Sequence, residues 1–467
     1  MRLLSGNLLK AGLLNLILFT GIFYLLQNES VYQNTLGQIS SNYIRLKVDG
    51  VTEIQQIKKP YVSISNGRLQ NWDADIYYCI KEKLYVKDDG CYSEVRGAFF
   101  PLFPLLWKVS QLNSIGISIL NYFLFILSLA ILVQLLYKGG AKEKLLIYAL
   151  LVVLPGTVIF YIPYTESLFL FTMTLAFAGH SQNNYRLYFI AVFGMAMLRP
   201  ATLFILLAIF TVDSLCFLSH RNLSFAVRNF LKKSIPFFLG LVVAILIQYA
   251  SSGSFTTMID AQKYWAGSIG LFHHISDWSK EGFGMNAFSV FFIAIPSLAF
   301  VIYSILKRKI FSRYYSETIQ RNENADSYFF LISIFYLAGI LIFIFLTAGG
   351  NLHSFFRFTM SSPAFYIVAL FTLNHLPVAN KRLGSILFII PLILLTVFLT
   401  QTGYGDGRFT FSFVGMHLSI ITFMFLYFYN HLKRSVQWVL ASILILLCVI
   451  WNTYLFNIFL CEGWIFT

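Results

Sequence analysis

The stretch that decides the fold class runs from Ile115 to Tyr137 and reads IGISILNYFLFILSLAILVQLLY. It contains no charged residue, and as a helix it is long enough to cross about 30 Å of hydrocarbon, which takes roughly 20 apolar residues. Five more stretches have the same character: Leu8–Leu26, Ile235–Ser251, Ala287–Leu306, Phe329–Thr347 and Val436–Phe459. The sequence therefore predicts an all-α polytopic membrane protein.

The composition supports this fold class and narrows the kind of partner. The chain has 467 residues, 58% of them hydrophobic and only 12% charged, a balance outside the range of ordinary globular proteins. Its formal net charge of +14 comes largely from basic residues in short gaps between apolar runs. These residues include Lys142, Lys144, Arg228, Lys232, Lys233, Lys307, Arg308, Lys309, Lys381, Arg382, Lys433 and Arg434. Such spacing is typical of cytoplasmic loops and argues against binding to nucleic acid.

The basic gaps also orient the chain. With Arg2 and Lys10 in the cytoplasm, the first apolar run acts as a retained signal anchor and delivers the following residues to the outer side. Alternating crossings then require two short hairpins, with arms expected at Leu146–Ile162, Ser167–Gly179, Leu187–Leu198 and Ala201–Phe217. We expect one integral-membrane domain over residues 1–467, with about eleven to thirteen spans and a large first extracytoplasmic loop at 27–98.

The candidate functional groups all fall on this outer side. They lie in the loop 27–98, in the hairpin tip 162–167, in the segments 252–286 and 349–359, and at the tip around Arg199. The cytoplasmic gaps are mostly short and basic, and they contain no Gly-rich loop that would cradle a nucleotide phosphate. Chemistry is therefore expected at the outer membrane face.

The loop 27–98 contains two closely spaced carboxylates, Asp73 and Asp75, next to Trp72. A carboxylate within reach of a hydroxyl serves as a general base, and aromatic faces pack against sugar rings. On an extended segment the two aspartates would lie on one side, whereas on a helix they would diverge. A loop turn or a helix cap also explains an aspartate here, and an Asp-x-Asp pair is an alternative ligand set for a divalent cation.

The cysteines show no metal-ligand spacing. Cys79 and Cys91 share the first loop and pair with each other if that loop faces an oxidising compartment. Cys216 and Cys448 lie in apolar runs, where packing explains them.

Two motifs in this region carry a family resemblance. Trp72-Asp73-Ala74, followed by Ala-Phe-Phe-Pro-Leu-Phe-Pro at 98–104, resembles the PIG-V-type GPI mannosyltransferases and their bacterial relatives. These are multi-pass GT-C glycosyltransferases that use lipid-phosphate sugars. The resemblance implies a GT-C-like helical bundle and assigns Asp73 as the catalytic base, with Asp75 as the second candidate. The two prolines also suit a simple helix entry, because proline fixes the backbone and removes amide donors.

Three shorter segments are similar to further motifs of that family. Tyr-Thr-Glu-Ser at 164–167 implies that Glu166 contacts the acceptor or supports the site, and Arg199 at the neighbouring tip is its expected partner. A helix N-terminus also explains Glu166, because negative charge is favourable there. Ala-Gln-Lys-Tyr-Trp at 261–265 suggests that Gln262 and Trp265 contact sugar or acceptor and that Lys263 supplies positive charge.

The third segment, Ser-Phe-Phe-Arg-Phe at 354–358 with Pro363, is similar to the family's Ser-x-x-Arg-Tyr motif, with Phe358 in place of the tyrosine. Arg357 is expected to steady the lipid phosphate, because a guanidinium binds phosphate oxygens in pairs. A membrane-edge anchor is the alternative for Arg357. His353 beside it is a further candidate for phosphate contact.

The sequence thus predicts an inverting enzyme that moves a hexose, with mannose implied by the resemblance, from a polyprenyl- or dolichyl-phosphate donor to a glycolipid, glycan or protein. No resident cofactor is expected. A bacterial plasma membrane is expected, with the endoplasmic reticulum membrane and a luminal site as the alternative. The rival interpretation from another class is a lipid-linked glycan flippase or transporter, which would need charges lining a path through the membrane. A membrane-anchored interaction protein is the third interpretation, and the number of outward polar motifs disfavours it.

Overall fold

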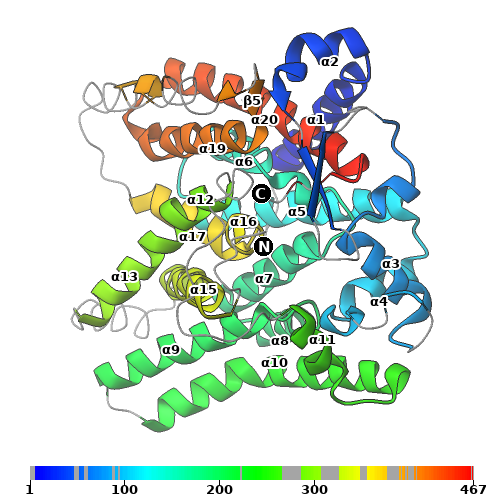
Figure 1. Cartoon of the computed structure of the whole chain (residues 1–467). Coiled ribbons are helices and arrows are strands. Elements are labelled where there is room, and N and C mark those ends of the chain that lie inside the picture. Colours follow the sequence, from blue (N-terminus) through cyan, green and yellow to red (C-terminus); the bar gives the residue numbers. More distant parts are fainter. Residues whose placement is uncertain are drawn as a thin grey trace.

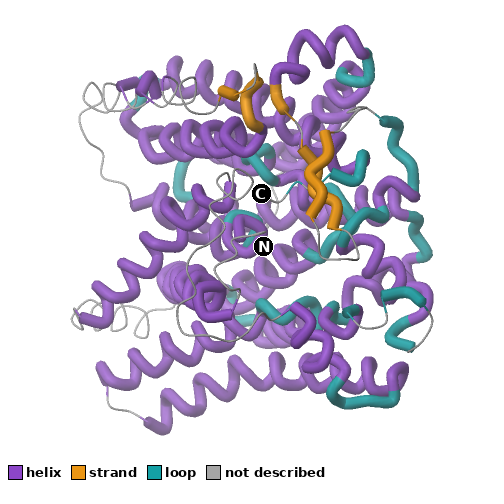
Figure 2. The backbone as a smooth tube through the Cα atoms, in the orientation of Figure 1, coloured by secondary structure: helices purple, strands orange, loops and turns teal. Residues whose placement is uncertain are grey.

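The structure is a computed structural model that consists mainly of helices (Figures 1 and 2). It describes residues 6–40, 42–46, 52–56, 62–86, 90–92, 95–220, 223–265, 285–306, 325–347, 355–375, 389–390, 392–394, 397, 404–405, 408–463 and 465.

Within these residues, six helical segments are long and apolar enough to cross a membrane, and they match the six stretches predicted from the sequence. They lie in α1 (Gly6–Leu25), α5 (Ser114–Leu136), α10 (Leu223–Ser252), the segment Met285–Tyr303, α15 (Ala325–Thr347) and α20 (Arg434–Leu460). The fourth segment joins α12 (Met285–Ser289), a π-helical turn at Val290–Ala294 and α13 (Ile295–Leu306). The prediction of a helical membrane protein is confirmed.

Shorter helices fill the rest of the described chain. They are α2 (Glu29–Thr35), α3 (Asp73–Lys83), α4 (Leu102–Ser110), α6 (Ala141–Val152), α7 (Glu166–Ser181), α8 (Tyr185–Ala196), α9 (Thr202–His220), α11 (Thr257–Trp265), α16 (Phe355–Thr359), α17 (Pro363–His375) and α19 (Phe411–Phe428). The strands are short: β1 (Ile39–Ser40), β2 (Asn42–Leu46), β3 (Thr52–Gln56), β4 (Tyr404–Gly405) and β5 (Arg408–Thr410). β2 and β3 form an antiparallel hairpin, while β5 pairs parallel to β1 and antiparallel to β4.

Helix α7 lies in the middle of the bundle, where it packs against α5, α8, α15 and α17 (Figure 1). Helices α9 and α10 pack together on one side of it, and α1 packs against α20 and α6 on the other. Helices α3 and α4 lie at the right-hand end of the bundle in Figure 1. The adjoining ends of α9 and α10 lie at the opposite end.

The chain between α6 and α7 is irregular yet buried, so its backbone groups need partners inside the protein. The Asn452 side chain donates to the carbonyls of Val153 and Leu154 and accepts from the Val158 amide. The Asn121 side chain donates to the carbonyls of Ile162 and Tyr164. Two buried asparagines therefore hold the segment that leads into Glu166, the first residue of α7.

One expectation about helix extent was wrong. The predicted arm Leu146–Ile162 ends as a helix at Val152, because Pro155 disfavours helical backbone before it and Gly156 has φ 87°. The prolines at 101 and 104 lie at a helix entry, as the sequence suggests. They begin the short helix α4, which ends at Ser110 before α5 starts at Ser114.

Candidate functional site

The Asp73 motif lies at the start of helix α3, and the two sides of this helix have different surroundings. Residues spaced at helical intervals on one side, Ala74, Tyr77 and Ile80, are buried against the protein. Asp73 is the first residue of the helix, and its side chain is 19% exposed. Trp72, just before it, has φ 59°, a conformation that an L-residue rarely adopts. This backbone turn fixes where α3 begins and therefore where Asp73 points.

The Asp73 carboxylate contacts Arg357, which lies 284 residues further along the chain. Arg357 Nη1 is 2.5 Å from Asp73 Oδ2, and the guanidinium lies over the Tyr164 ring, 4.6 Å from its centroid. Arg357 belongs to α16, and the amide of the preceding Phe356 donates to the side chain of Asn286 at 2.9 Å. The helix that carries Arg357 is thus fixed from within the bundle.

Glu166 completes a cluster of four charges. Its Oε1 atom accepts from Arg357 Nε at 2.5 Å and from Arg199 Nη1 at 3.0 Å. The expected pairing of Arg199 with Glu166 is therefore present. We call Asp73, Glu166, Arg199 and Arg357 the ionic cluster. Its two carboxylates and two guanidiniums balance in formal charge.

The electrostatics of the cluster follow from its burial. The Glu166 side chain is fully buried, and the side chains of Arg199 and Arg357 are only 10% and 8% exposed. Charges in such surroundings are tolerated when they are paired, and removal of one partner leaves an uncompensated charge. Asp73 is the most exposed member. A ligand that approaches from solvent would therefore meet Asp73 first.

Two tyrosines next to the cluster stay neutral. Burial is the main reason that the pKa values of Tyr77 and Tyr164 lie well above the usual tyrosine value, and the Asp73 carboxylate raises both further. The Tyr77 hydroxyl lies 3.3 Å from the hydroxyl of Thr165. This contact links α3 to the residue immediately before Glu166.

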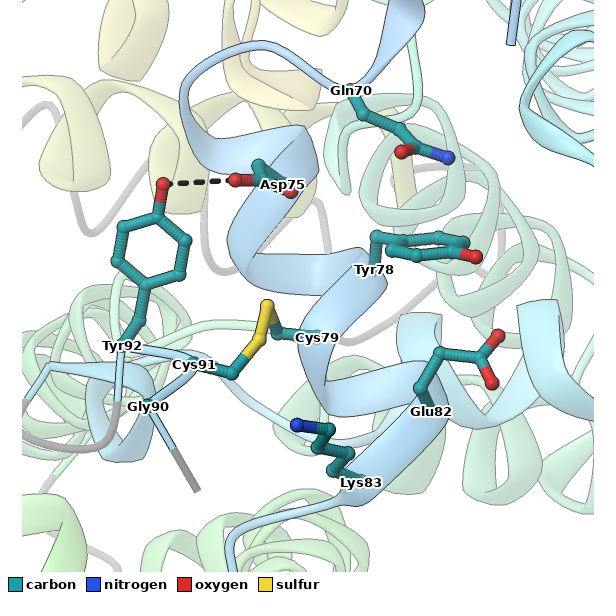
Figure 3. Close-up of a pocket in the computed structure, with 9 residues that line it drawn as sticks. All are labelled: Gln70, Asp75, Tyr78, Cys79, Glu82, Lys83, Gly90, Cys91 and Tyr92. Atoms are coloured by element: carbon teal, nitrogen blue, oxygen red, sulfur yellow. Dashed lines mark hydrogen bonds between the residues drawn. A yellow bond between two sulfur atoms is a disulfide. The ribbon is translucent and has the colours of Figure 1, made fainter. Parts of the chain in front are cut away.

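The other side of α3 carries Asp75. Because the segment is helical, Asp73 and Asp75 diverge: Asp75 Oδ2 accepts from the Tyr92 hydroxyl at 2.8 Å. Burial first, and then the bond to Asp75, raise the pKa of Tyr92 to about 12. A disulfide between Cys79 and Cys91 holds the Tyr92 segment against α3, so the cysteine pairing that the sequence left open is present (Figure 3).

A groove of about 500 Å³ runs along this side of α3 (Figure 3). We call it the α3 groove; its lining residues are Gln70, Asp75, Tyr78, Cys79, Glu82, Lys83, Gly90, Cys91 and Tyr92. Asp73 is not among them. The described residues contain no group of three or more His, Cys, Asp or Glu side chains placed to hold a metal ion.

The remaining predicted site residues are described less fully. Gln262, Lys263 and Trp265 lie on α11, and the placement of their side chains is outside the described structure, as is His353 altogether. Helix α11 packs against the turn at Arg96–Ala98. A side chain at Gly97 would come within 2.5 Å of the Thr257 carbonyl oxygen, so glycine permits this close approach.

Sequence reasoning missed a second buried ion pair. Lys233 Nζ lies 3.1 Å from Asp213 Oδ1, and the Tyr328 hydroxyl donates to the same oxygen. The pair joins α9, α10 and α15. The available signal was Asp213 itself, a lone carboxylate inside an apolar run.

Fold and site together define a multi-pass helical membrane protein with a buried ionic cluster at the start of α3. Comparison with known protein families, with curated proteins and with solved structures finds no match to this chain.

Proposed function

We propose that the protein is a GT-C-type glycosyltransferase that moves a hexose, mannose by resemblance, from a polyprenyl- or dolichyl-phosphate donor to a hydroxyl of an extracytoplasmic acceptor. The observation that carries the proposal is the contact between Asp73 and Arg357. It joins the residue expected to take the acceptor proton to the residue expected to bind the departing phosphate. The two residues come from motifs that lie far apart in the sequence.

The reaction needs one base and one anion-stabilising group. The acceptor oxygen attacks the anomeric carbon from the side opposite the phosphate, the bond from that carbon to the phosphate oxygen breaks, and the configuration inverts. Asp73 takes the hydroxyl proton, and the lipid phosphate leaves with the electron pair. Arg357 and Arg199 supply the positive charge that stabilises the leaving group.

Within this scheme Glu166 is a positioning residue. It holds both guanidiniums through one oxygen and is too buried to meet solvent. Contact with Arg357 holds the Asp73 carboxylate in place at the start of α3. When the donor phosphate binds, it competes with Asp73 for Arg357, so the Asp73 carboxylate becomes available to the acceptor hydroxyl.

The sidedness of the chain is consistent with this scheme. Helix α3 and the basic residues at the start of α10 lie at opposite ends of the bundle. With the basic end in the cytoplasm, Asp73 faces the extracytoplasmic side, where lipid-phosphate sugars are used by the family that the motifs resemble.

The test is sugar release from a synthetic polyprenyl-phosphate mannose by purified protein in nanodiscs. A glycolipid extract serves as the acceptor, and water serves as a slower acceptor in its place. Asp73→Asn should reduce turnover by roughly two to four orders of magnitude, because the amide keeps the shape of the carboxylate but cannot accept the proton. Asp75→Asn is the matched control and should be milder. Near-normal turnover in folded Asp73→Asn protein would refute the role of Asp73. Movement of the intact donor across liposomes without bond cleavage would support a transporter instead.

A further inference from the structure

The α3 groove shares its helix with Asp73 but has a different chemical character. Tyr78, Cys79 and Glu82 lie three, four and seven residues after Asp75, so the four residues form one face of α3. Tyr92 closes the groove on one side and Gln70 lies near its end (Figure 3). Arg357 approaches the helix on the face that carries Asp73.

Charge separates the two faces. The residues that line the groove include two carboxylates, Asp75 and Glu82, and one cation, Lys83. Lys81 does not line the groove, but it contacts Glu82 at 2.8 Å and lies 4.8 Å from the centroid of the Tyr78 ring. A phosphate in the groove would face Asp75 and Glu82 with no guanidinium in the lining, whereas at the ionic cluster it would meet the guanidiniums of Arg357 and Arg199. The groove therefore suits the anionic donor less well than the ionic cluster does.

The groove does suit a hydroxyl-rich ligand. Tyr92 is 46% exposed, and Tyr78 is partly exposed with its ring edge-on to Trp107. Aromatic rings of this kind offer apolar faces to the C–H side of a sugar. Asp75 Oδ1 accepts no hydrogen bond from the described residues, and the Gln70 amide nitrogen donates to Ser114, so oxygen acceptors remain for ligand hydroxyls. Carboxylate acceptors form strong hydrogen bonds with such donors.

We propose that the α3 groove binds a neutral saccharide, the sugar part of the acceptor, and so sets acceptor specificity. The role of this saccharide as the acceptor rests on the proposed function, whereas the binding of a saccharide in the groove does not. Asp75 and Asp73 are two residues apart, about 3 Å along the helix axis but on opposite sides of the helix. A saccharide seated in the groove must therefore extend past the N-terminal end of α3 to bring a hydroxyl to Asp73. The disulfide at Cys79 and Cys91 keeps the groove wall fixed to the same helix.

The test measures binding without donor, by saturation-transfer NMR on protein in nanodiscs, which avoids sugar-based detergents. Methyl α-D-mannoside is the neutral probe and mannose 6-phosphate is its anionic counterpart. We expect transfer to the methyl mannoside only, and at least a tenfold weaker dissociation constant in Tyr78→Ala. Glu82→Lys should admit mannose 6-phosphate, because it reverses an exposed charge in the groove. Glu29→Lys, the same reversal at an exposed site on α2, should change neither result.

Two competitors identify the source of the saccharide: soluble mannobiose for a free glycan, and a mannosyl lipid in the nanodisc for a glycolipid. Absence of transfer to methyl mannoside in the wild type would overturn the proposal, as would equal binding of both probes or unchanged binding in Tyr78→Ala. Asp73→Asn should bind methyl mannoside normally. In the wild type, absence of sugar transfer with intact mannoside binding would count against the enzyme assignment alone, and sugar transfer without mannoside binding would count against the groove alone.

Discussion

Replacement of Glu166 by Gln should unbalance the ionic cluster and destabilise the fold. The variant keeps the shape of the side chain but removes the charge that both Arg199 and Arg357 contact. The two guanidiniums are then left with Asp73 as their only carboxylate within the cluster. Because Glu166 is fully buried, water cannot replace the lost charge.

The magnitude follows from the two contacts. At an effective dielectric constant of 20, two unit charges 4 Å apart attract by about 4 kcal/mol, and Glu166 has two such partners. Relief of the carboxylate's own desolvation offsets part of this loss. Disruption of a buried pair costs about 3–5 kcal/mol in proteins, and we expect Glu166→Gln to fall in that range.

The paired variant Glu166→Gln with Arg199→Met isolates the charge effect. It removes one anion and one cation, and it leaves Asp73 with Arg357 as a balanced pair. Methionine also suits the site, because Arg199 lies over the rings of Phe169 and Phe358. The paired variant should recover at least half of the stability lost by the single variant.

The assay is SDS-induced unfolding of the purified protein, followed by tryptophan fluorescence, for the wild type and both variants. Circular dichroism before unfolding checks that each variant is folded. A single variant as stable as the wild type would refute the argument that Glu166 balances the cluster. A paired variant less stable than the single one would show that packing, rather than charge, dominates at this place.

Three further outcomes follow from the site. Arg357→Ala should weaken apparent donor affinity more than Arg357→Lys, because lysine keeps the charge but loses the planar fork; equal, near-normal values would assign Arg357 to anchoring. In ultraviolet difference titrations against Tyr92→Phe, the Tyr92 phenol should ionise near its pKa of about 12. In Asp75→Asn it should ionise at a lower pH, because burial is then the only cause that still raises the pKa of Tyr92. Its raised pKa means that it stabilises the fold below pH 10 and that this contribution is lost as the pH rises through 12; an unchanged midpoint in Asp75→Asn would contradict the contact. Replacement of both Cys79 and Cys91 by serine should cost about 3 kcal/mol and lower the hydrogen-exchange protection of α3, and unchanged protection would contradict the structure.

The membrane-spanning part of the fold could be predicted from the sequence because lipid imposes a simple rule. A helix that crosses hydrocarbon needs about 20 apolar residues whatever its neighbours are, and all six predicted stretches appear as such helices. The arm at Leu146–Ile162 failed because burial inside a bundle allows irregular backbone wherever a side chain such as Asn452 satisfies it.

The site was predictable only in part. The pairing of Arg199 with Glu166 could be anticipated, since the two lie at neighbouring hairpin tips. The direction of Asp73 and Asp75 could not, because aspartate suits both a loop and a helix start, and the short α3 has charges at both ends. The contact of Asp73 with Arg357 depends on how segments 284 residues apart pack, and hydropathy gives only their side of the membrane.

The positions of the cluster residues along the chain determine the order in which they are synthesised. Arg199 follows Glu166 by 33 residues and Arg357 follows it by 191. At about 5–20 residues per second, Arg357 emerges roughly 10–40 s after Glu166. During that interval α7 holds a carboxylate that lipid will not accept and that only one of its two final partners can neutralise. Until α16 is made, Arg199 is therefore the only arginine of the ionic cluster that can pair with Glu166. We therefore expect loss of Arg357 to lower the yield of protein inserted into the membrane.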